Sequence, residues 1–178
     1  MSSSALLRAV LLFAATSSLA PLAACSSDSS TAAEPAVSDV VLDGGATESQ
    51  LRTFLDSPSD TWAWAGGRFE SPKAGTVLPS DVPFQFSWRA DPTDTAEAGA
   101  PDDLQMLYLL VFATPSQSNL LRVFTTESSY TPDATAWQSL VAAGAPLSLS
   151  LTTATFAGGA PTADGGPHRG QKLTFTIE

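Results

Sequence analysis

The sequence predicts an all-β domain over residues 61–178, a β-sandwich of about seven short strands with one short helix. Three observations indicate this class. Pro and Gly recur between short runs of residues from Thr61 onward, apolar and polar residues alternate within several runs, and segments with a helical period are scarce. A chain of 178 residues can hold one ordinary domain and a tail but not two full-sized cores, so we expect one domain.

The firmest strand lies where aromatic and polar residues alternate. Phe84, Phe86 and Trp88 are separated by Gln85 and Ser87, so the three rings should share the face that enters the core. Residues 104–112 are apolar almost throughout, which is typical of a central strand covered on both sides. The remaining strands are expected at 68–70, 76–78, 120–126, 147–151 and 173–177.

One helix is expected between these strands. Thr131 is the expected N-cap, Pro132 takes the first helical position and Gly144 ends the helix. Its apolar face consists of Trp137, Leu140 and Val141. We expect this helix to close one end of the sandwich.

Two aromatic residues give the domain a family resemblance. Trp88 ends one strand within Phe86-Ser87-Trp88, and Tyr108 lies on the next within Leu107-Tyr108-Leu109. In this the domain resembles fibronectin type III and related immunoglobulin-like modules of bacterial surface lipoproteins, although the helix near residues 132–143 departs from that pattern. The resemblance covers about two thirds of the chain and implies a fold, an immunoglobulin-like sandwich, without a function.

The N-terminal residues predict an export signal. A positively charged start up to Arg8 precedes a short apolar run, Ala9–Ala15, and the segment ends in Leu22-Ala23-Ala24-Cys25. This ending resembles the lipobox of bacterial lipoproteins, which implies cleavage before Cys25 and attachment of a diacylglyceryl group, with fatty acyl chains such as palmitate, to its sulfur. Cleavage after Ala20 is disfavoured because Pro21 would follow. An uncleaved anchor and a secreted protein with a stray thiol are the alternatives, but the chain's one cysteine stands at the acceptor position.

The resemblance to bacterial lipoproteins also predicts in which membrane the protein resides. Asp after the acylated cysteine retains lipoproteins of this type at the inner membrane, whereas this chain has Ser26, so we expect the outer membrane of a Gram-negative bacterium. The formal net charge of −10 repels phosphate backbones and anionic lipids, which argues against nucleic-acid partners and polybasic membrane binding. Membrane attachment should therefore depend on the lipid.

Residues 25–60 are expected to form a flexible acidic tether between the signal peptide, residues 1–24, and the domain. The segment is rich in Ser, Ala, Thr and acid, with Arg52 as its one basic residue. Within it, Thr47 and Gln50 fit a capping box, and Leu51, Phe54 and Leu55 have helical spacing. A helix near residues 47–57 would be marginal alone, so it is docked on the domain, offered to a partner, or not formed.

Motifs for catalysis are missing from the sequence. There is no G-x-S-x-G, H-E-x-x-H, P-loop or paired C-x-x-C motif, and the one histidine, His168, lies in a Gly-rich stretch that we interpret as an exposed loop. We therefore expect no cofactor and no enzyme activity, with an exported enzyme as the least favoured class.

Two groups of residues are candidate ligand sites. Trp62 and Trp64 share one face of an extended segment, so they either pack inward or form a platform for glycan. Five acids between two strands are a candidate calcium site without EF-hand spacing, while the ordinary interpretation is a solvated loop. These acids are Asp91, Asp94, Glu97, Asp102 and Asp103.

Together these observations favour a lipid-anchored, non-catalytic module that acts as a structural or protein-binding unit of the cell envelope. The alternative is a lipoprotein that binds carbohydrate or peptidoglycan through the tryptophans.

Overall fold

The computed structural model describes residues 39–59, 66–90, 103–144 and 146–178. Within these ranges the fold is mostly β, with two short helices, α1 (Glu48–Asp56) and α2 (Ala134–Ala142). The larger sheet contains β1 (Val40–Asp43), β3 (Val77–Leu78), β5 (Gln105–Ala113), β6 (Leu121–Thr125), β8 (Leu147–Ala157), β9 (Ala160–Pro161) and β10 (His168–Ile177). The smaller sheet contains β2 (Arg68–Ser71), β4 (Phe86–Arg89) and β7 (Ser129–Tyr130).

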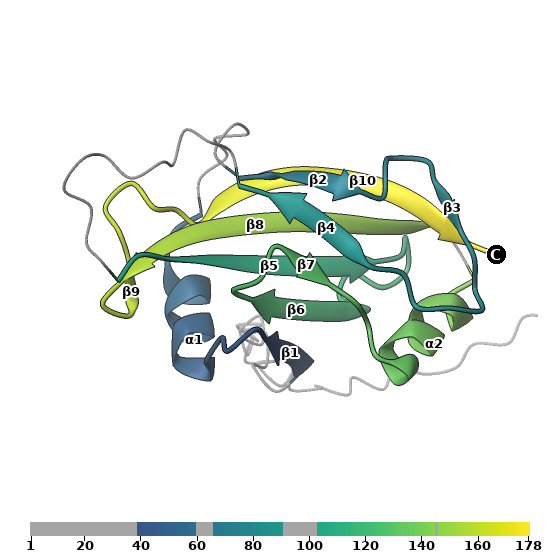
Figure 1. Cartoon of the computed structure of the whole chain (residues 1–178), viewed down its shortest axis with the longest axis horizontal. Coiled ribbons are helices and arrows are strands. Elements are labelled where there is room, and N and C mark those ends of the chain that lie inside the picture. The colour runs from purple at the N-terminus through teal and green to yellow at the C-terminus, as the bar shows by residue number, and fades with distance from the viewer. Residues whose placement is uncertain (1–38, 60–65, 91–102, 145) are drawn as a thin grey trace, which may run out of the picture. The chain divides into compact units, whose positions relative to one another are not determined.

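The larger sheet is mixed. Its strand order is β1-β6-β5-β8-β10-β3, with β9 paired to β8, and the smaller sheet has the order β2-β4-β7 (Figure 1). The two outermost pairs of the larger sheet, β1 with β6 and β3 with β10, are parallel, while its other pairs are antiparallel. Every predicted strand region contains a strand, and β1, β7 and β9 are short strands that the sequence pattern did not indicate.

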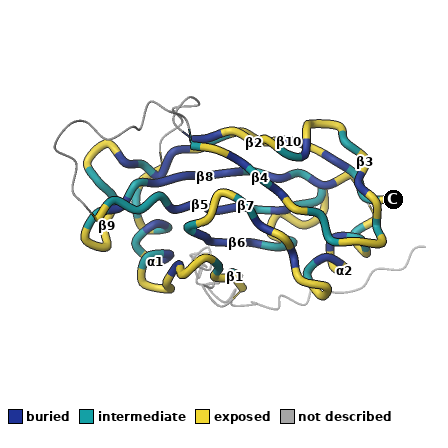
Figure 2. Tube along the Cα trace, in the orientation of Figure 1, coloured by how far each residue is buried: buried dark blue, intermediate teal, exposed yellow. Residues whose placement is uncertain are grey.

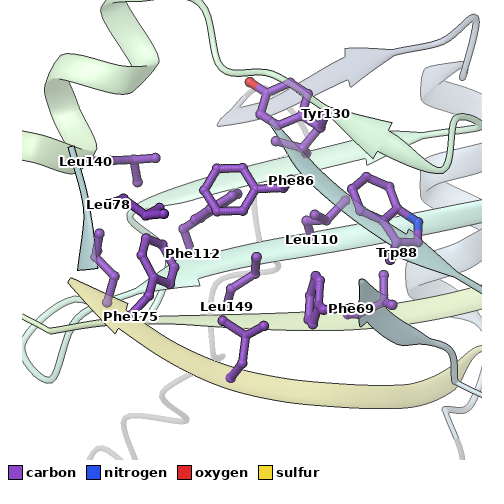
Figure 3. Packing of buried hydrophobic residues seen from close by; sticks show 14 of the residues in the cluster. Phe69, Leu78, Phe86, Trp88, Leu110, Phe112, Tyr130, Leu140, Leu149 and Phe175 are labelled. Atoms are coloured by element: carbon purple, nitrogen blue, oxygen red, sulfur yellow. The ribbon is translucent and has the colours of Figure 1, made fainter. Parts of the chain in front are cut away.

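An apolar core lies between the two sheets, which gives the fold a sandwich-like architecture. We call it the inner core. Phe86 of β4 contacts Phe112 of β5 and Phe175 of β10, with ring centroids 5.0 and 5.6 Å apart (Figure 3). The predicted face of Phe86 and Trp88 is buried, and Phe84 packs its ring on Phe86 just before the strand begins. Each such ring pair adds about 0.5–1.5 kcal/mol beyond its area burial.

Helix α1 covers part of the other face of the larger sheet. There it closes a second apolar cluster, the outer core, which consists of Ala46, Leu51, Phe54, Leu107, Leu109, Phe124, Ala154 and Phe156. The predicted capping box forms, with Gln50 N–H donating to Thr47 Oγ1 and Thr47 N–H donating to Gln50 Oε1. Leu51 and Phe54 are both buried. The helix is therefore docked on the domain, and residues 39–59, which the sequence assigned to the tether, form a strand and a helix on the sheet.

Helix α2 lies at the end of the strands opposite α1 (Figure 1). Trp137 and Leu140 are buried in the inner core as expected, and the Trp137 indole N–H donates to the backbone oxygen of Ser80. The expected cap was wrong. Asp133 is the N-cap, because its carboxylate accepts from the backbone N–H of Ala136 at 2.7 Å, and the helix begins two residues after Pro132.

The two sheets meet most closely where the chain enters β2. A Cβ on Gly170 would lie 1.7 Å from the backbone oxygen of Gly66, so only glycine permits this approach. Gln171 completes the junction, since its N–H donates to Gly67 O and its side-chain oxygen accepts from Phe69 N–H. A register shift in β10 between Arg169 and Lys172 accompanies this contact.

Candidate functional site

The predicted lipidation site lies outside the described residues. Cys25 and the lipobox residues Leu22, Ala23 and Ala24 belong to residues 1–38, so cleavage and acylation stay predictions. Neither α1 nor α2, the helices of the described part, is long and apolar enough to cross a membrane.

Trp62 and Trp64, the candidate glycan platform, also lie outside the described residues. The aromatic side chains in the described ranges are buried, apart from Phe84, which is half-buried against the inner core. The described surface therefore offers no exposed ring on which a sugar could stack.

Of the five candidate calcium ligands, only Asp103 is described. Its carboxylate accepts the backbone N–H of Gly158 at 2.8 Å, which fixes the turn between β8 and β9 (Figure 1). The described residues contain no group of three or more His, Cys, Asp or Glu side chains that could hold a metal ion. Asp103 thus has a structural partner, while Asp91, Asp94, Glu97 and Asp102 lie in the range that is not described.

The prediction for His168 was wrong. His168 is the first residue of β10 and only 7% exposed, not an exposed loop residue. Its Nε2 lies 2.9 Å from the backbone oxygen of Asp164, and it pairs across the sheet with Thr153 of β8. The sequence concealed this strand start because Gly170 and the register shift interrupt the alternation that continues from Leu173.

An ion pair between the buried Arg122 and the largely exposed Asp39 joins the start of β1 to the rest of the larger sheet. Arg122 of β6 is 5% exposed, and one of its terminal nitrogens lies 2.6 Å from a carboxylate oxygen of Asp39, which directly precedes β1. Arg122 is the register partner of both Val40 in β1 and Val111 in β5. Removing Asp39 would take a negative charge away from a buried guanidinium, which is unfavourable, so the pair helps to hold the start of β1 beside β6. No local sequence pattern predicts this pair, since the two residues are 83 positions apart.

Exposed apolar side chains in the described ranges gather at edges of the larger sheet. Val41 and Leu42 of β1 are 39% and 42% exposed, and Val77 of β3 is 56% exposed. Figure 2 shows β1 as one of the more exposed strands, in contrast to β5 and β8. Val82, in the loop after β3, is the other large apolar residue that is exposed.

The C-terminal end of β1 is acidic. The Asp43 carboxylate accepts from Thr125 Oγ1 at 3.1 Å, and the same hydroxyl accepts the backbone N–H of Glu127. Burial, together with the negative charges of Asp133 and Asp43, raises the pKa of Tyr130 to about 12. Asp43 therefore places negative potential beside the inner core as well as at the sheet edge.

The indole N–H of Trp88 is buried without a hydrogen-bond acceptor among the described residues. Its ring packs edge-on against Tyr108, with centroids 5.6 Å apart, so the two residues that carry the family resemblance touch. Burial raises the pKa of the Tyr108 hydroxyl. Sequence reasoning placed both residues in the core but gave no indication of an unpaired donor.

Comparisons with known proteins add no further identification. No protein-family model and no curated protein matches this chain.

Proposed function

We propose that this chain is an exported lipoprotein, held to a membrane by lipid on Cys25, whose immunoglobulin-like domain is a non-catalytic module that binds a protein of the cell envelope. The lipobox and the single cysteine support the anchor. The outer membrane is the proposed location, because Ser26 and not Asp follows the cysteine.

The strand order supports the finer fold assignment. Lettered along the chain, β2, β4 and β7 correspond to strands A, B and E, and β5, β6, β8 and β10 correspond to C, C′, F and G. The sheets are then A-B-E and G-F-C-C′, the division typical of immunoglobulin-like sandwiches. The contact between Trp88 on strand B and Tyr108 on strand C agrees with the resemblance to fibronectin type III modules.

One observation carries the binding role. In the described part of the chain, three of the four exposed large apolar side chains lie on sheet-edge strands, where backbone groups are also open to a partner. In contrast, His168, Asp103 and Arg122 are engaged in structural contacts. Edge strands with apolar side chains are surfaces on which proteins add a strand from a partner. This distribution favours recognition of a protein over chemistry on a small substrate.

The first described residue, Asp39, limits the reach of the proposed anchor. If the lipid is on Cys25 and the domain begins at Asp39, thirteen residues connect them, which can span at most about 45 Å. The domain would then stay close to the membrane surface, nearer than a tether ending at residue 60 would hold it.

Crosslinking of intact cells followed by mass spectrometry tests this proposal. The expected result is a crosslinked envelope protein that is lost in the Cys25→Ala variant, together with a mature product that begins at an acylated Cys25. A mature product with an unmodified thiol would contradict the anchor. A pattern of crosslinks that is the same in both proteins would contradict the anchored binding role.

A further inference from the structure

We propose that β1 binds an extended segment of a partner protein as an additional strand, and that this segment carries apolar residues flanked by Lys or Arg. The inference rests on the proposed protein-binding role and adds the surface and the chemistry of the partner. It starts from the position of β1, which within the described part of the chain pairs on one side only, with β6.

An added strand would continue both apolar cores. Val41 pairs in register with Val123 of the inner core, and Leu42 pairs with Phe124 of the outer core. Because neighbouring residues of a strand point to opposite faces, Val41 and Leu42 extend the two cores to the rim of the sheet. Their exposed fractions, 39% and 42%, measure the apolar surface that a further strand could cover.

The other described sheet edges are less suited to this role. β3 and β7 have two residues each, too few for a ladder of hydrogen bonds. β2 has four residues, but Arg68 and Glu70 are exposed on it, and charged side chains protect an edge from pairing. β1 also has four residues, and Val40-Val41-Leu42 contains no charge and no proline.

Charge determines which partner fits. Among the described residues, the side-chain donor to the Asp43 carboxylate is the hydroxyl of Thr125. Glu127 lies close by, since a Cβ on Gly44 would be 2.7 Å from its Cγ. Neither carboxylate forms an ion pair with another described residue. In a chain of net charge −10, these two carboxylates favour a segment with a cationic side chain at this end of the strand.

A second copy of the chain fits this edge poorly. When the same edge of two copies pairs in antiparallel fashion, residues of the same parity lie opposite each other, because the backbone N–H and C=O groups of two facing residues either both point toward the partner strand or both point away from it. If the two copies pair with Val41 opposite Val41, Asp39 lies opposite Asp43 of the second copy. If they pair with Leu42 opposite Leu42, Val41 lies opposite Asp43 of the second copy. Neither register supplies a cation to Asp43, and like charges directly opposite are destabilising.

Synthetic peptides test the inference on the full chain in detergent solution. The probe is Lys-Thr-Val-Thr-Val-Thr-Lys, compared with the same core flanked by Glu and with an N-methylated Lys-flanked form that cannot donate backbone hydrogen bonds. We expect the Lys-flanked peptide to bind in calorimetry and to slow amide hydrogen exchange in Val40–Asp43. The Glu-flanked peptide should bind about tenfold more weakly at low salt, with a difference that shrinks as salt is added, and the N-methylated form should not bind.

Two variants form a matched pair. Leu42→Lys should weaken binding of the Lys-flanked peptide by about tenfold or more, because it places a charge on the edge. Val77→Lys makes the same change on β3 and should leave binding unchanged. If Leu42→Lys does not fold, the hydrogen-exchange pattern of the unaltered chain still decides the question.

Three results would overturn the inference: no binding of the Lys-flanked peptide, protection outside β1, or equal affinity for the Glu-flanked peptide. A stable dimer in sedimentation, with β1 protected in the absence of peptide, would also overturn it and make a second copy the occupant. Crosslinks to an envelope protein that avoid β1 would overturn the inference while leaving the proposed function intact.

Discussion

The inner and outer cores lie on opposite faces of the same sheet but are closed in different ways. The inner core is covered by the smaller sheet and by α2, whereas the outer core is covered by α1, a helix of nine residues. Strand β8 contributes side chains to both cores. Its side chains toward the inner core, such as Leu147, Leu149 and Leu151, are buried at every second position.

The opposite face of β8 changes character along the strand. Ser148, Ser150 and Thr152 are half-buried, and then Ala154 and Phe156 are buried under α1. The change from polar to apolar residues on one face thus marks where the helix docks. A short helix that is marginal alone becomes stable when such a face receives its apolar side chains.

The largest expected effect comes from the centre of the inner core. Phe86→Ala removes a fully buried ring that contacts Phe84, Phe112 and Phe175, and should lower the free energy of unfolding by about 3–5 kcal/mol. Denaturant unfolding followed by tryptophan fluorescence measures this loss. Phe84→Ala is the control, because a half-buried ring at the rim should cost about 1 kcal/mol. Similar losses for both variants would contradict the central position of Phe86.

The outer core should lose less stability, and lose it locally. Phe54→Ala removes a ring that packs on Phe124 at 5.2 Å and Phe156 at 6.5 Å, and we expect a loss of about 3 kcal/mol. Hydrogen exchange should show faster exchange in Glu48–Asp56, with β5 and β8 still protected.

Arg52→Ala is the control for this variant. It breaks an exposed pair with Glu48 on the opposite face of the same helix and should change stability by about 0.3–0.5 kcal/mol. If Phe54→Ala also removed the protection of β5 and β8, the two cores would have to form one cooperative unit.

A smaller effect is expected at the start of α1. Thr47→Ala removes the side chain that accepts from Gln50 N–H and should cost about 1 kcal/mol, seen as a lower unfolding midpoint with more fraying of the helix. Thr47→Ser keeps the hydroxyl and should retain nearly all of the stability. An equal loss in both variants would mean that the methyl group, and not the cap, is what stabilises this turn.

The difference between the cores also explains which features the sequence could predict. Strand alternation predicted the buried face of Phe86 and Trp88, and the capping box at Thr47 and Gln50 predicted the helix start, because both signals are local. The docking of α1, the short strand β1 and the ion pair of Asp39 with Arg122 depend on residues 70 to 102 positions apart. No local pattern contains that information. The position of His168 in a strand was missed for a different reason, because the register shift between Arg169 and Lys172 interrupts the alternation of β10.

One further effect, which appears only above pH 10, links β1 to the inner core through charge. In the folded chain the pKa of Tyr130 is about 12, whereas an unfolded chain ionises near the ordinary value of 10. Stability due to Tyr130 is therefore fully present below pH 10 and falls as the pH rises from 10 to 12, by up to about 1.4 kcal/mol per pH unit. Ultraviolet titration of the phenols measures the pKa, and Tyr130→Phe identifies the band against that of Tyr108.

Asp43→Asn should lower the pKa of Tyr130 only slightly. It removes the charge on β1 but keeps an oxygen that can accept from Thr125, and burial, the largest cause of the shift, stays in place. Because Asp133 also contributes and is unchanged, the pKa should remain clearly above 10. A fall to the ordinary value would show that the inner core opens when the end of β1 is altered, whereas no change would show that the charge at this edge does not reach the core.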